Sequence, residues 1–226
     1  MLFLISLIFT VTTFTRFGQC QDDFYSWKDI PTIVNETHLI FAMGPSGGEI
    51  RGYAAIRRVP EPAGEQVFYI NGLLSPDIQV KRGVTYYIFP LTGLDNHVYI
   101  TNDERGGYAN LNNFWRQRQQ VYAGLDSAGS PEVIGLRCDY STDLRPRQID
   151  LVESYERFMP SLKVIKLNFQ YFFPNFLKFQ FQLDCFRSTY SMNTYFTWTP
   201  DRNTPSTVYY QSYKTPNIGG KIFVEN

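Results

Sequence analysis

The chain has 226 residues, 43% hydrophobic and 19% charged, which is enough apolar material for a core and excludes wholesale disorder. Lysine plus arginine and aspartate plus glutamate number 21 each, so no basic excess is present to hold the phosphates of a nucleic acid. Aromatic residues make up 17% of the chain, beside 16 glycines and 13 prolines. This mixture favours strands joined by turns and predicts an all-β fold.

The N-terminal segment predicts the compartment. Residues 1–15 form a nearly continuous apolar and threonine-rich run without a charge, followed by small and polar residues up to Cys20. We expect a signal peptide over residues 1–20, cleaved after Cys20, and therefore a secreted, extracellular protein. A membrane anchor is the alternative, but the run is too short to span a bilayer comfortably. No comparable segment closes the chain at residues 223–226, so no membrane span is expected.

The cysteines and one sequon agree with that compartment. Removal of Cys20 leaves Cys138 and Cys185, an even pair for which one structural disulfide is the simplest interpretation. Asn35 opens the Asn-x-Thr sequence that ends at Thr37 and is the expected glycosylation site.

Taken in chain order, the predicted elements are mostly short strands. Two extended runs at residues 38–42 and 50–57 flank a glycine-rich turn and predict a β-hairpin. Residues 60–66 contain prolines and predict a linker at a domain boundary. From residue 67 onward, closely spaced turns separate β-rich runs, a pattern typical of a sandwich or Greek-key barrel. The clearest runs are residues 78–80, 84–89 and 98–100, and the helical candidates are residues 112–120 and 151–158.

Residues 164–182 break this pattern. The stretch is dominated by phenylalanine and contains no acidic residue and no glycine. Residue types with A/T-rich codons make up most of it, so a retained in-frame intron is one interpretation. A core hairpin is another, because alternating phenylalanine suits a strand. An aromatic binding loop is the third.

Motif analysis predicts no enzymatic activity. The sequence contains no nucleophile elbow, Walker loop, dinucleotide fingerprint or His-Glu-x-x-His motif. Its two histidines are His38, inside an apolar run, and His97, which follows a turn and opens a β run. We interpret His38 as structural and His97 as the more interesting candidate for a site.

Three separated blocks resemble the plastocyanin-like terminal domain of Skeletor and Knickkopf proteins, in the family order. They read YINGLLSPDIQVKRGVTY at residues 69–86, HVYITNDERGGY at 97–108 and WTPDRNTPSTVYYQSY at 198–213. The resemblance implies a cupredoxin-like Greek-key β-sandwich over residues 67–226. The run LIFAMGP at residues 39–45 resembles the closing strands of the DOMON domain that precedes it, which makes residues 21–59 a DOMON remnant.

The resemblance also implies a degenerate copper site. A cupredoxin centre needs two imidazoles and one thiolate. In the family, two residues separate the first histidine from Tyr-Ile-Thr, whereas only Val98 separates His97 from Tyr99, so this spacing puts His97 one residue out of register. The positions of the cysteine and the second histidine are occupied by Ser212 and Thr215. We therefore expect no metal and no cofactor.

The function that the resemblance implies is that of a secreted, non-enzymatic protein of the extracellular matrix or cuticle, with chitin as a possible partner. A copper-dependent electron-transfer protein of the DOMON and cupredoxin type is the alternative, and the residues at 212 and 215 weigh against it. A spindle-matrix scaffold is a third hypothesis, and the predicted signal peptide conflicts with it.

Overall fold

The structure is a computed structural model that describes residues 31–47, 52–53, 57, 66–135, 137–142, 162–164 and 194–226. Six sequence predictions lie wholly or mostly outside these residues. They are the signal peptide at 1–20, the strand at 50–57, the linker at 60–66, the helix at 151–158, the phenylalanine-rich stretch at 164–182 and the half-cystine Cys185.

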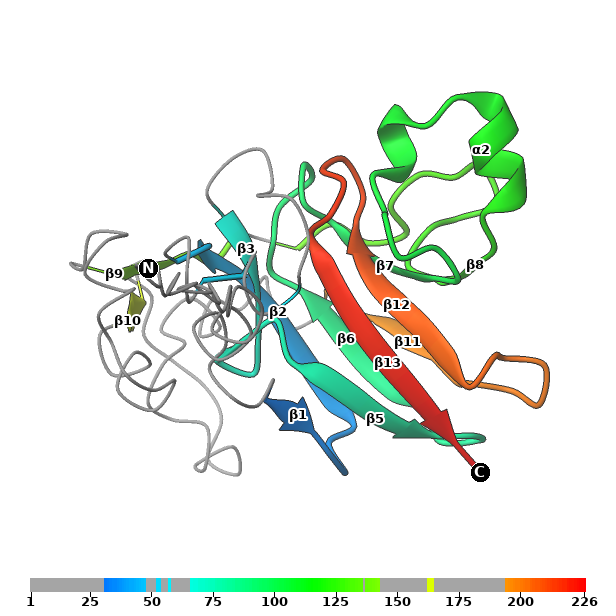
Figure 1. The fold of residues 1–226 in the computed structure, drawn as a ribbon, viewed down its shortest axis with the longest axis horizontal. Coiled ribbons are helices and arrows are strands. Elements are labelled where there is room, and N and C mark those ends of the chain that lie inside the picture. The colour runs from blue at the N-terminus through cyan, green and yellow to red at the C-terminus, as the bar shows by residue number, and fades with distance from the viewer. Residues whose placement is uncertain are drawn as a thin grey trace, which may run out of the picture.

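Strands dominate the described part of the chain and form two facing sheets, so the predicted all-β sandwich is confirmed (Figure 1). The first sheet contains, in spatial order, β1 (Thr32–Ile33), β5 (Asp77–Lys81), β13 (Gly219–Glu225), β12 (Thr207–Ser212), β7 (Val98–Thr101) and β8 (Val121–Ala123). The second contains β11 (Phe196–Trp198), β6 (Tyr86–Pro90), β2 (His38–Pro45), β3 (Gln66–Ile70) and β4 (Leu73–Leu74). A separate pair joins β9 (Tyr140–Thr142) to β10 (Leu162–Val164).

The core lies between the two sheets. Along β5 the side chains of Ile78 and Val80 are buried while their neighbours are exposed or half-buried, as expected for a strand with one face on a core. Aromatic rings join the sheets, since the ring of Phe41 on β2 meets that of Tyr210 on β12 edge-on with centroids 5.5 Å apart. The predicted strands at 78–80, 84–89 and 98–100 correspond to β5, β6 and β7.

The strand β2 is a member of the second sheet. It pairs antiparallel with β3 and parallel with β6, where His38 lies opposite Tyr87. Of the run 50–57, which the sequence predicts as its hairpin partner, the structure describes Gly52, Tyr53 and Arg57. The DOMON origin of residues 21–59 and the linker at 60–66 stay predictions, as does the cupredoxin assignment.

The connection between β7 and β8 carries the helical segments. The 3-10 turn η1 (Tyr108–Asn110) precedes α2 (Asn113–Arg118), which corresponds to the helix predicted at residues 112–120. Asn112 caps α2, because its side chain accepts a hydrogen bond from the backbone N–H of Trp115. This segment lies beyond one end of the sheets (Figure 1). Within the described residues, no helix is long and apolar enough to cross a membrane.

Candidate functional site

His97 is fully buried at the start of β7. Its Nε2 lies 2.7 Å from the carbonyl oxygen of Gly124, so Nε2 carries the proton and donates it. Its Nδ1 is buried and has no hydrogen-bond partner among the described residues. Burial lowers the pKa of His97 to about 4, against a smaller upward effect of the bond to Gly124. The imidazole is therefore neutral at physiological pH.

The other two predicted site residues, Ser212 and Thr215, converge on a neighbour of His97. The hydroxyls of Ser212 and Thr215 each donate to Oδ1 of Asn96, both over 3.2 Å. The backbone N–H of Thr215 in turn lies 3.3 Å from Oγ of Ser212. We call Asn96, Ser212 and Thr215 the polar triad. Ser212 is fully buried, whereas the other two members are half-buried.

Strand pairing positions the polar triad. Ser212 ends β12 and lies opposite Val98 of β7, and the next backbone N–H, of Tyr213, donates to the carbonyl of His97 over 2.8 Å. The backbone of Ser212 is held on both sides, because its N–H donates to Ile218 and its carbonyl accepts from Gly107. The backbone of His97 thus adjoins the triad, while its imidazole is bonded to Gly124.

The spacing along the chain identifies Asn96 as the residue that sequence reasoning missed. Two residues, His97 and Val98, separate Asn96 from Tyr99. That is the spacing which the family resemblance gives for the first histidine ligand. The spacing could therefore have identified Asn96 from the sequence, but the adjacent His97 was assigned instead because it is a histidine.

A lysine close to the polar triad in sequence is paired with an exposed carboxylate. Lys214, which follows the triad residue Ser212 by two positions, forms an ion pair with Asp95. This contact holds the pKa of the Asp95 carboxyl below its usual range. Both side chains are largely solvent-exposed, so the pair adds little to stability.

The chemistry of the polar triad does not suit copper. It offers one amide oxygen and two hydroxyl oxygens, which are hard, neutral donors, whereas type 1 copper requires two imidazole nitrogens and a thiolate. In the part of the chain that the structure describes, no cluster of three or more His, Cys, Asp or Glu side chains is placed to hold a metal ion. The polar groups of the triad instead form hydrogen bonds with one another.

Two further predicted residues bear on the compartment. Cys138 is buried and disulfide-bonded, and the identity of its partner stays a prediction because Cys185 lies outside the described residues. Asn35 is exposed in the turn between β1 and β2, with a φ of 61°, so its amide is accessible to a glycosyl transferase.

Comparison with known proteins gives two relatives and one family. The chain is 31% identical over 214 residues to Protein Skeletor, isoforms B/C, and equally to Protein Skeletor, isoforms D/E, both of Drosophila melanogaster. Each alignment covers 88% of this chain but 24% and 12% of the two relatives, so the chain spans a quarter of their length or less. Residues 49–149 match the family described as an At5g54830-like domain. No solved structure matches the chain. The chain is therefore similar to part of Skeletor.

Proposed function

We propose that this Skeletor-like chain is a secreted, non-enzymatic protein of the extracellular matrix or cuticle. In its sandwich, the hydrogen-bonded polar triad occupies the place of a lost copper centre. The homology to Skeletor and the resemblance of its three sequence blocks to the Skeletor and Knickkopf domain support the family context. That family context also makes chitin organisation the expected role.

One observation carries the proposal: the residues at the three expected ligand positions bind one another. Asn96 accepts hydrogen bonds from Ser212 and Thr215. By the family resemblance, these three residues stand where a copper-binding member has histidine, cysteine and histidine. A serine hydroxyl stays protonated near neutral pH, and threonine offers no nitrogen, so neither can act as a copper ligand in a type 1 site. The triad instead ties the turn before β7 to the end of β12, which is a structural role.

The extracellular part of the proposal is supported by different residues. The exposed Asn35 lies in a sequon, and Cys138 is in a disulfide, a bond that persists in oxidising compartments. The N-terminal apolar run supplies the expected export signal.

Expression of the full chain in insect cells tests compartment and metal content together. We expect the protein in the culture medium, with a glycan that glycosidase removes and that Asn35→Gln lacks. Titration of the purified protein with Cu(II) should give no intense blue charge-transfer band, because that band requires a thiolate. Retention in the nuclear fraction would contradict the extracellular assignment and favour a spindle-matrix role, and a blue wild-type protein would favour electron transfer.

A further inference from the structure

The segment between β7 and β8 contains a surface pocket that the polar triad does not involve. Its volume is about 290 Å³, at the small end of the range for ligand sites. Residues that follow β7 line it together with residues in and next to α2, namely Asn102, Asp103, Arg105, Leu111, Trp115, Arg118 and Gln119. None of the residues of α2 is buried, so this helix contributes little to the core and its side chains are free to serve another purpose.

One wall of the pocket is an exposed indole that its neighbours hold in place. Trp115 is 52% exposed, and the ring of Phe114 meets it edge-on at 5.2 Å between centroids. The guanidinium of Arg118 lies 3.9 Å from the centroid of Phe114 and 5.8 Å from that of Trp115. These contacts favour one position of the indole before a ligand arrives, which reduces the entropy lost on binding.

The other walls offer both acceptors and donors. Nε2 of Gln119 donates to the Asp103 carboxylate over 2.9 Å and lies 3.0 Å from the hydroxyl of Tyr99. Because a carboxylate accepts only, this contact fixes the amide orientation, and Oε1 of Gln119 is buried without a partner among the described residues. The Asp103 carboxylate accepts from Nε2 of Gln119 and from the backbone N–H of Arg105, and it has lone pairs left for a further donor. Among the described residues, no hydrogen bond or ion pair engages the guanidinium of Arg105, so its N–H groups are free to donate.

We infer that this pocket binds a single pyranose unit of a neutral glycan, with the sugar stacked on Trp115. A pyranose has a face of C–H bonds that suits the electron-rich face of an indole. Its hydroxyls both donate and accept, so they match the Asp103 carboxylate and the free N–H groups of Arg105 together. An anion would be repelled by the Asp103 carboxylate and would bring no hydrogen-bond donor for it. An apolar ligand would leave both polar groups desolvated and unpaired.

This inference deepens the proposed function, because it gives the extracellular partner a chemical class and a site. Secretion and copper titration test the proposed function separately, so failure of glycan binding would overturn the site alone.

Binding of soluble oligosaccharides to the full chain tests the inference. The probes are β-1,4-linked oligomers of N-acetylglucosamine and of glucose, with a sulfated heparin oligomer as the anionic comparison, and calorimetry measures affinity. We expect at least one neutral oligomer to bind, and Trp115→Ala and Arg105→Met each to weaken it about tenfold or more. Thermal unfolding of both variants should match wild type, because the side chains of Trp115 and Arg105 are exposed.

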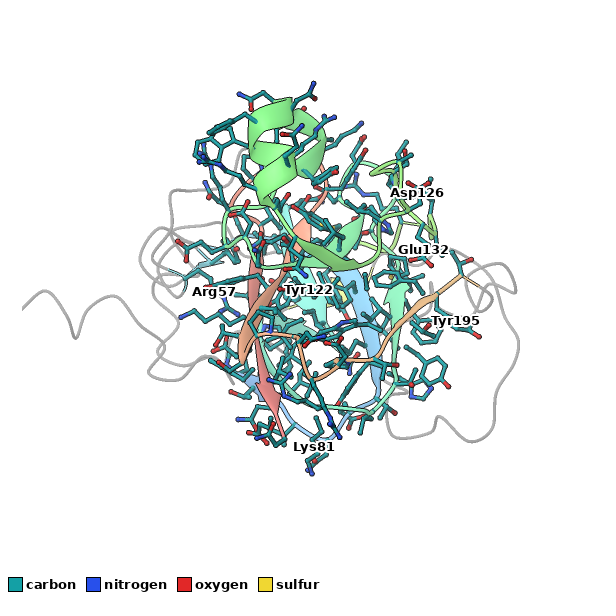
Figure 2. The ribbon with its side chains drawn as sticks, turned by 90° about the vertical axis from the view of Figure 1, so that its right-hand side faces the viewer. Arg57, Lys81, Tyr122, Asp126, Glu132 and Tyr195 are labelled. Atoms are coloured by element: carbon teal, nitrogen blue, oxygen red, sulfur yellow. The ribbon has the colours of Figure 1, made fainter. Side chains whose placement is uncertain are left out.

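A matched control uses another exposed aromatic residue. Tyr195 is 41% exposed and lies on a different part of the surface from α2 (Figure 2), so Tyr195→Ala should leave glycan affinity unchanged. The inference is overturned if no neutral oligomer binds, if Trp115→Ala binds as well as wild type, or if Tyr195→Ala causes the loss instead. It is equally overturned if the heparin oligomer binds best and high salt abolishes its binding.

Discussion

Acid should destabilise this protein through His97, a buried histidine that cannot take up a proton favourably. In the folded chain Nε2 donates to the carbonyl of Gly124, and Nδ1 is buried without a partner among the described residues. Protonation would therefore place a charge on a desolvated ring and a new N–H against no acceptor. For this reason burial lowers the pKa of His97 from 6.5 to about 4.

The sign and size of the effect follow from linkage. Between these two pKa values the unfolded chain binds a proton and the folded chain does not, so stability falls as the pH falls from 6.5 to about 4. Above 6.5 the stabilisation is fully present, and below about 4 no further loss comes from this residue. One pKa unit corresponds to about 1.4 kcal/mol, so the total loss is about 3 kcal/mol.

Urea denaturation at a series of pH values, followed by intrinsic fluorescence, measures this loss. The variant His97→Gln retains an N–H for the carbonyl of Gly124 but does not titrate. The unfolding free energy of wild type should therefore fall by about 3 kcal/mol relative to that of His97→Gln as the pH falls from neutral to about 4. Parallel curves for wild type and His97→Gln would refute the reasoning.

Two further predictions concern stability and oxidation. Asp77→Asn should lower the unfolding free energy by about 3 kcal/mol in urea denaturation, because it leaves the buried guanidinium of Arg57, 2.6 Å from the carboxylate, without its counter-charge. Lys214→Gln, which breaks an exposed pair, should leave stability nearly unchanged, and equal effects of the two variants would contradict this ranking. Secreted protein denatured without reductant should show no free thiol from Cys138 or Cys185, and a titration of two thiols per chain would refute the predicted disulfide.

The strands themselves were predictable, whereas their partners were not. Ile78 and Val80 alternate with polar residues, and nearby turns bound the run, so local pattern alone predicts β5. The pairing of β2 with β6 brings His38 beside Tyr87 across a long stretch of chain, and no local periodicity encodes that choice. The glycine-rich run at residues 44–48, whose composition is typical of a turn, suggested a nearer partner instead.

The candidate site was also predictable only in part, because local sequence motifs reveal some of its residues and strand pairing determines the rest. Ser212 and Thr215 follow from their block, because the spacing of the family motif is preserved there. Asn96 has the spacing of the first ligand, but it was missed because the neighbouring His97 has the imidazole that the family site requires. The bond of His97 to Gly124 depends equally on the pairing of β7 with β8, which a single sequence does not show.

Restoring ligand chemistry to the polar triad tests the lost copper site most directly. The triple variant Asn96→His, Ser212→Cys, Thr215→His should bind copper and show an intense blue charge-transfer band, because it places two imidazoles and a thiolate where three side chains already meet. The double variant Ser212→Cys, Thr215→His should stay colourless, because the imidazole of His97 is bonded to Gly124. A blue wild-type protein, a double variant as blue as the triple variant, or a folded triple variant without colour would contradict the assignment of these three residues.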